Sequence, residues 1–187
     1  MSVKVPLPTD DELTPELRET LANLPPLNVF RMIAGAPSAA RPFMQLGAAV
    51  LNGAGLDPRR REIVVLRVAH ATDAAYEHAQ HLQLARNVGV SEAEIAAIDS
   101  EEPVTSLDEE ANLLCRVADE VSRDVRLSDE ALEHAIERYG ARNAAELILL
   151  ASYYNMVSRF LESTRVEIES EGLLKGTTSG QIVEGAS

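Results

Sequence analysis

The chain has 187 residues, of which 45% are hydrophobic and only 4% aromatic, so one domain with a mainly aliphatic core is expected. Thirty acidic and seventeen basic residues give a formal charge of −13, which repels phosphate backbones and anionic lipid surfaces and argues against nucleic-acid and membrane binding. The sequence shows no signal-peptide pattern and no apolar run of about eighteen residues, so a cytoplasmic protein is expected.

Residues 1–39 are predicted to form a proline-rich N-terminal segment that contains one short helix. Thr14 and Pro15 have the pattern of a helix N-cap followed by proline at the first helical position. The remainder of this segment is expected to wrap over the domain surface or over a neighbouring subunit.

Residues 40–170 are predicted to form one helical domain. Residues that favour a helix start recur along it, namely Pro42, Asp57, Asp73, Ser91, Ser106 and Ser128. Gly140 is placed where a helix would end, and the longest periodic stretch follows it, from 143 to about 169. No segment alternates polar and apolar residues as a strand would, so the fold class is all-α. Residues 171–187 are predicted to form a flexible C-terminal tail.

Cys115 is the only cysteine, so the chain can form no internal disulfide and cannot run a two-thiol redox cycle by itself. The sequence around it, Ala-Asn-Leu-Leu-Cys-Arg-Val-Ala, has the pattern of an amphipathic helix. This setting favours a buried, unreactive thiol.

Three ionisable residues interrupt otherwise apolar helices in the middle of the chain. Glu62 lies in a strongly apolar helix, where a charge is costly unless it is paired. Glu77 and His81 are four residues apart and hence on one face of the next helix. A turn at Thr72-Asp73 folds the two helices into a hairpin that brings Glu62 opposite this face. Two carboxylates and an imidazole in a partly apolar cleft suit general acid–base catalysis, whereas a buried ion-pair network that only fixes the helix register is the alternative.

Four other residues are candidates for binding a substrate. Arg67, a charge embedded in the first of these helices, and Arg159, in the last long helix, would each meet a substrate carboxylate. Arg159 would alternatively pair with Glu162. His70, near the end of the first helix, would line the same cleft or be a core histidine bonded to a backbone carbonyl. Tyr154 would line the cleft or only pack within the core.

His78 and His81 are three residues apart, a spacing at which two histidines can chelate a metal ion, with Glu77 or His70 nearby. No recognised motif places a third ligand, so neither a metal nor another cofactor is expected. Metal-dependent chemistry through these two histidines stays as a further alternative.

The run from Arg61 to Ala69, followed after a short turn by Tyr76-Glu77, His81 and Gly89, resembles the core of the carboxymuconolactone decarboxylase family. The later stretch Tyr153–Arg159 resembles the closing helix of many members, and the similarity covers about residues 40–165. The resemblance implies an all-α, alkylhydroperoxidase D-like helical domain that assembles into a homo-oligomer.

In alkylhydroperoxidase D proteins the motif is a glutamate, a Cys-x-x-Cys pair and a histidine four residues after the second cysteine. On this chain the glutamate and the histidine fall on Glu62 and His81, whereas the two cysteine positions hold Ala74 and Glu77. The resemblance therefore implies that disulfide-based peroxide reduction is absent.

The decarboxylase branch is closer, because it resembles this chain in having glutamate at the second cysteine position together with the histidine. Its enzymes are cofactor-free and release CO2 from an unsaturated lactone acid. By this resemblance His81 would donate or relay a proton, Glu77 would orient it, and Glu62 would complete the relay. The predicted function is a cofactor-independent lyase or isomerase that acts on a small carboxylated lactone or keto acid. The alternative is a catalytically idle family member that serves as a small-ligand binder or as an oligomeric scaffold.

Overall fold

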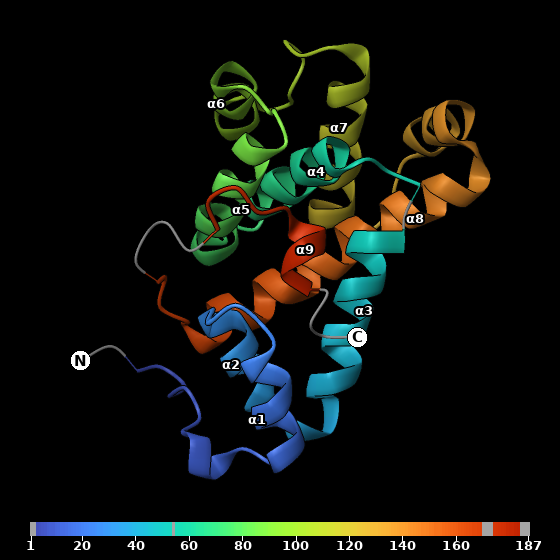
Figure 1. The fold of residues 1–187 in the computed structure, drawn as a ribbon. Coiled ribbons are helices and arrows are strands. Elements are labelled where there is room, and N and C mark those ends of the chain that lie inside the picture. The colour runs from blue at the N-terminus through green and yellow to red at the C-terminus, as the bar shows by residue number, and fades with distance from the viewer. Residues whose placement is uncertain (1–2, 54, 170–173, 184–187) are drawn as a thin grey trace.

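The computed structural model describes residues 3–53, 55–169 and 174–183, and within them every regular element is helical (Figure 1). The elements in chain order are η1 (Asp10–Glu12), α1 (Pro15–Ala22), α2 (Asn28–Ala34), α3 (Pro37–Gly53), α4 (Pro58–Ala71), α5 (Ala75–Asn87), α6 (Glu92–Ser100), α7 (Glu109–Arg123), α8 (Asp129–Thr164) and α9 (Ser179–Val183). The all-α prediction is confirmed for this part of the chain. None of these helices is both long enough and apolar enough to cross a membrane.

Helix α4 is the centre of the fold, because it contacts α5, α6, α7 and α8 (Figure 1). Every residue from Arg61 to Ala69 is buried. Burial of aliphatic side chains such as Ile63 and Leu66 drives this packing, at roughly 25 cal/mol per Å² of apolar surface removed from water. The polar side chains on α4 are therefore held in place by neighbours on several sides.

Helix α4 also shows how the capping residues set the helix starts. The side chain of Asp57 accepts a hydrogen bond from the backbone N–H of Arg60 at 3.0 Å, and Pro58 occupies the first helical position. Helices α1, α6 and α8 begin in the same way after predicted caps, at Thr14, Ser91 and Ser128. These four predicted starts are confirmed.

Three helix starts differ from the prediction, and one of them is α5, which begins at Ala75 after Ala74 instead of directly after Asp73. Helix α3 begins at Pro37 instead of Pro42, because the carbonyl of Ala36 accepts the hydrogen bonds that open its first turn. Pro42 lies inside the helix, so the predicted boundary between the N-terminal segment and the domain falls within α3. Helix α7 begins after Asp108, whose side chain caps it, instead of after Ser106.

Helix α2 lies in the N-terminal segment and carries no capping signal in the sequence. The residue at its N-cap, Leu27, has no side chain that accepts a hydrogen bond. Instead, the carboxylate of Glu169 accepts a hydrogen bond from the backbone N–H of Asn28. Phe30 and Ile33 are buried, and the helix packs against α3. This part of the N-terminal segment therefore packs on its own domain.

The long helix α8 is interrupted at Gly140, whose φ of 75° and ψ of 156° are not helical. Glycine adopts such a φ without a steric penalty, so the helix predicted to close at Gly140 does close there and a second one follows directly. The second helix ends at Thr164, earlier than predicted, because Arg165 has a left-handed backbone with φ 58°.

The described part of the predicted flexible tail, residues 174–183, is folded against the domain. Leu174, Ile182 and Val183 are buried, and α9 packs against α3. The side-chain amide of Asn87 donates hydrogen bonds to the carbonyls of Leu174 and Thr177 at 2.8 and 2.7 Å. Because these contacts join distant segments, no local sequence pattern announces them. The rest of the predicted tail, 171–173 and 184–187, lies outside the described residues.

Candidate functional site

The α4–α5 hairpin brings Glu62 and His81 together. Thr72 follows the end of α4 and Asp73 takes a positive φ of 52°, after which α5 begins. Across the hairpin, Nδ1 of His81 lies 2.7 Å from Oε2 of Glu62. Along α5, Nε2 of His81 lies 3.4 Å from Oε2 of Glu77, one turn away. The structure therefore places one imidazole between two carboxylates, which is the juxtaposition that the sequence predicts.

All three of these side chains are buried, with Glu62 wholly enclosed and His81 6% exposed. Burial by itself opposes protonation of His81, but the charge of Glu62 and hydrogen bonds with Glu62 and Glu77 outweigh it and raise the pKa of His81 to about 10. The imidazole is therefore a cation at neutral pH. Oε1 of Glu62 has no hydrogen-bond partner among the described residues, so the charge of Glu62 is compensated mainly through His81.

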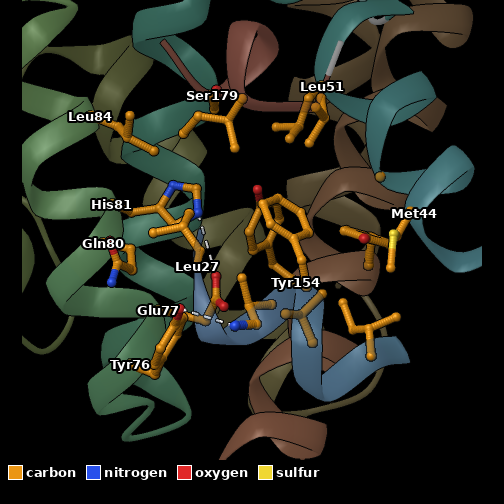
Figure 2. Close-up of a pocket in the computed structure, with 18 of the residues that line it drawn as sticks. Leu27, Met44, Leu51, Tyr76, Glu77, Gln80, His81, Leu84, Tyr154 and Ser179 are labelled. Carbon is orange, nitrogen blue, oxygen red and sulfur yellow. Dashed lines mark hydrogen bonds and ion pairs between the residues drawn. The ribbon is translucent and has the colours of Figure 1, made fainter. Parts of the chain in front are cut away.

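A pocket of about 80 Å³ opens against His81 and Glu77 (Figure 2). Side chains from α2, α3, α5, α8 and α9 form its wall, and most of them are aliphatic or aromatic. About 10–15 Å³ holds one water molecule, so the pocket has room for several waters or a small organic ligand. Among the described residues that line it, none is lysine or arginine. Glu62 does not line the pocket and lies behind His81, to which it is hydrogen-bonded.

Tyr154, one of the predicted substrate-binding residues, lines the pocket across from His81 (Figure 2). The two ring centroids are 4.9 Å apart and the ring planes meet at 87°. Burial, followed by the charges of Glu77 and Glu62, raises the pKa of Tyr154 well above its usual value, so its hydroxyl keeps its proton. Tyr154 is thus a neutral hydrogen-bonding group beside a cationic imidazole.

Helix α3 approaches this wall closely at Gly47. A Cβ atom at that position would lie 2.4 Å from the hydroxyl oxygen of Tyr153, which is far inside contact distance. Gly47 and Tyr153 both line the pocket, so a side chain at position 47 would disturb its wall. Nothing in the local sequence around Gly47 signals this requirement.

Arg67 and His70, both predicted to bind substrate, are not among the residues that line this pocket. Arg67 is fully buried; its Nε donates to Oδ1 of Asp119 at 2.8 Å and its Nη1 to the carbonyl of Ile98 at 2.6 Å. Both Arg67 and His70 also contact Glu102, at 3.1 and 2.9 Å. The cause is helix geometry: at about 100° per residue, Arg67 points roughly 140° away from Glu62, toward α6 and α7.

Arg159 also fails to reach the pocket. Its guanidinium donates two hydrogen bonds to Asn155, one to the side-chain oxygen and one to the backbone carbonyl at 3.2 Å. It donates a third to the backbone carbonyl of Ser122 at 3.4 Å. In the described part of the chain it forms no ion pair with Glu162, so neither predicted role of Arg159 is supported. The arginine instead ties α8 to the end of α7.

His78 and His81 are directed toward different partners. Nε2 of His78 lies 2.9 Å from Oδ1 of Asp99 on α6, whereas His81 contacts Glu62 and Glu77. Within the residues that the structure describes, no group of three or more histidine, cysteine and acidic side chains is arranged to hold a metal ion.

Cys115 is fully buried on α7, as its sequence setting predicts. Burial raises the pKa of its thiol to about 12, so the thiolate that redox and nucleophilic chemistry requires is scarcely populated at neutral pH. Its neighbours include Arg67 and Asp119, which places it on the α7 side of α4 and away from the pocket.

Besides Tyr153, three polar residues of the pocket wall were not among the predicted site residues. Tyr76 and Gln80 lie on α5, one turn apart and next to Glu77 and His81, so a helical-wheel reading of α5 would have found them. Ser179 comes from α9, and its buried hydroxyl has no hydrogen-bond partner among the described residues. No local signal connects Ser179 to the hairpin.

Comparison with known proteins gives one family match. Residues 37–120, which include α4 and α5, match the model of the carboxymuconolactone decarboxylase family. No curated protein matches this chain significantly.

Several solved structures share the fold. An uncharacterized peroxidase-related protein with an alkylhydroperoxidase AhpD core, from Ralstonia eutropha JMP134, is 17% identical with a TM-score of 0.80, over 92% of this chain and 95% of that one. An uncharacterized peroxidase-related protein from Silicibacter sp. TM1040 is 15% identical, with a TM-score of 0.77 and the same coverage. A protein of unknown function from Agrobacterium tumefaciens, described as a putative antioxidant defence protein AhpD, is 22% identical, with a TM-score of 0.62 over 72% of this chain and 93% of that one. The helical architecture is therefore alkylhydroperoxidase D-like.

Proposed function

The chain belongs, through its core at residues 37–120, to the carboxymuconolactone decarboxylase family, and from this premise we propose that its pocket is the active site of a cofactor-independent lyase or isomerase. The substrate class is a small carboxylated lactone or keto acid. The observation that carries the proposal is the protonated imidazole of His81, held between Glu62 and Glu77 at the wall of an apolar pocket.

The chemistry assigns a separate task to each residue. When a lactone acid loses CO2, the electron pair of the broken carbon–carbon bond enters a dienolate, which then takes a proton on carbon. His81 supplies that proton and regains one from solvent. Glu77, which faces the pocket, orients Nε2 of His81, while Glu62 holds Nδ1 from behind and keeps the ring protonated.

The apolar wall supports this assignment. Charge interactions are stronger in a pocket that excludes water, so a cationic donor beside the reacting carbon stabilises the developing negative charge effectively. The neutral hydroxyl of Tyr154 is a second donor available to the enolate oxygen. The same groups suffice for isomerisation, because that reaction also forms an enolate, which is then protonated on carbon.

A thiol-peroxidase activity receives no support from the residues of this chain. The two positions that carry cysteine in the peroxidase motif hold Ala74 and Glu77, and Cys115 is buried with a raised pKa. We therefore propose acid–base chemistry for this protein, although two of the structurally similar proteins are described as peroxidase-related.

The second candidate is a catalytically idle, self-associating family member. Leu149 and Met156 project from one face of α8 and are 45% and 43% exposed, while Leu132 and Ile136 are exposed on its first half. Large apolar side chains at helical spacing on a surface suit packing against a second copy. A homo-oligomer is therefore proposed for either candidate function.

Turnover of a substrate panel distinguishes the two. Lactone acids and β-keto acids are incubated with the protein in D2O, and mass spectrometry follows CO2 loss, isomerisation and deuterium content. The expected result is conversion of at least one compound, with one solvent deuteron on carbon in its product, because the exchangeable proton of His81 comes from solvent. If every compound of the panel is recovered unchanged and undeuterated, the idle function is favoured.

A further inference from the structure

Glu169 places its carboxylate against the pocket wall, although it is far away in sequence. The hydroxyl of Tyr76 donates to its Oε1 at 2.8 Å, and Nε2 of Gln80 donates to its Oε2 at 2.6 Å. The backbone N–H of Asn28 also donates to Oε1. Both oxygens of this carboxylate are thus bound.

The hydroxyl of Tyr76 is oriented for this task. It accepts a hydrogen bond from the backbone N–H of Val29 at 3.1 Å, so its own proton is left to point at Glu169. Burial, and then the hydrogen bond to Glu169, raises the pKa of Tyr76, so that proton is retained. The donor is therefore fixed in position and in protonation state.

The donors are neutral and belong to the pocket. Tyr76 and Gln80 line it, on the same helix as Glu77 and His81 (Figure 2). Hydrogen bonds from neutral donors to a carboxylate are charge-assisted and hence stronger than those between neutral groups. Among the described residues that line the pocket none is lysine or arginine, and both ring nitrogens of His81 already face Glu62 and Glu77, so the neutral donors Tyr76 and Gln80 suit a ligand carboxylate.

We propose that Tyr76, Gln80 and the Asn28 N–H form the binding site for the carboxylate of the pocket's ligand, and that Glu169 occupies this site until a ligand displaces it. The ligand is a small monocarboxylate whose apolar body lies against the aliphatic and aromatic wall. This assignment rests on the proposed function, because it gives the carboxylated substrate the recognition that Arg67 and Arg159 do not provide.

The test uses the full chain with Glu169→Ala and a series of straight-chain monocarboxylates from acetate to hexanoate. Dissociation constants are measured by titration calorimetry. With the carboxylate at the donors and the chain in the apolar pocket, each added methylene is expected to tighten binding about fourfold until the pocket is filled. Hexanamide, which has the same body without the charge, is expected to bind at least tenfold more weakly than hexanoate.

The neighbouring Glu167→Ala variant is the matched control, because Glu167 lies on the same segment but is exposed and paired with Lys4. This variant is expected to bind hexanoate as weakly as the wild type, because in both proteins Glu169 competes with the ligand carboxylate for the same donors. Adding Tyr76→Phe to Glu169→Ala should weaken binding about tenfold or more. Glu169→Gln, which keeps the size of the side chain but not its charge, should also bind hexanoate more tightly than the wild type and serves if Glu169→Ala does not fold.

Affinities that do not depend on chain length, or that are equal for hexanoate and hexanamide, would overturn the proposal. Equal binding by Glu169→Ala and Glu167→Ala would do so as well. The outcome is separable from that of the proposed function. A chain that binds these acids as described but converts no lactone acid fails only the proposed reaction. A chain that converts lactone acids with an unchanged KM in Glu169→Ala fails only the carboxylate site.

Discussion

Replacing His81 with glutamine is expected to lower kcat/KM on any accepted substrate by about 10² to 10⁴, the range that a positioned general acid contributes. Glutamine is close in size and can still hydrogen-bond to Glu62, but it cannot release a proton to carbon. The rate is measured with the compound identified in the panel. A loss of activity of about threefold or less would show that His81 is not the general acid, because the loss of a general acid is expected to cost far more than that.

Loss of folding has to be separated from loss of catalysis in this experiment. Without the imidazolium, Glu62 is a buried carboxylate that has lost its hydrogen-bonded cation, so the single variant is also expected to be less stable. The double variant His81→Gln/Glu62→Gln removes this imbalance. It should recover stability but not turnover, whereas recovery of both would show that His81 has a structural role only.

Glu62→Gln alone tests the positioning role of Glu62. Its charge raises the pKa of His81, so its loss lowers that pKa. Because catalysis requires the protonated ring, activity falls as the pH rises through the His81 pKa, and this alkaline limb should move to lower pH in the variant. Glu62→Asp should restore part of the shift, whereas an unchanged pH profile would show that Glu62 does not act through His81.

Replacing Arg67 with methionine is expected to lower the free energy of unfolding by about 3–5 kcal/mol, one of the largest single-residue effects in this fold. The guanidinium is fully buried, and its removal leaves Asp119 and the carbonyl of Ile98 without their donor. Urea denaturation followed by circular dichroism measures the change.

Arg159→Met is the matched control, because Arg159 is an exposed arginine whose hydrogen bonds go to Asn155 and Ser122. Its loss should cost no more than about 1 kcal/mol. KM should be the same in both variants, since neither arginine lines the pocket. A stable Arg67→Met protein with a raised KM would restore the substrate-binding role that the sequence suggests.

The helices that could be predicted from the sequence are those whose ends are set locally. Asp57 with Pro58 and the glycine at position 140 act on their own backbone, so their effect is visible in a few residues. Helices α2 and α9 could not be predicted, because they are held in place by residues that are far away in the sequence. Glu169 supplies the hydrogen bond at the start of α2, and Asn87 binds the carbonyls that precede α9.

The same distinction applies to the candidate site. Glu77 and His81 are one helical turn apart, and a short turn returns the chain to Glu62, so their meeting follows from spacing. The direction of Arg67 relative to Glu62 also follows from helical spacing, but its partners on α6 and α7 come from contacts between distant segments. The contact between Glu169 and Tyr76 spans 93 residues and depends on how α8 ends, so no local pattern contains it.

Nuclear magnetic resonance titration of the imidazole nitrogens of His81 measures whether this ring is a cation held by two carboxylates at the wall of the pocket. The expected pKa is about 10, against 6.5 for an unperturbed histidine. The imidazolium would then stabilise the fold fully below pH 6.5, and this contribution would be lost as the pH rises toward 10. A pKa at or below 6.5 would rule out His81 as the proton donor, because the ring would be neutral at physiological pH and would have no proton ready to donate.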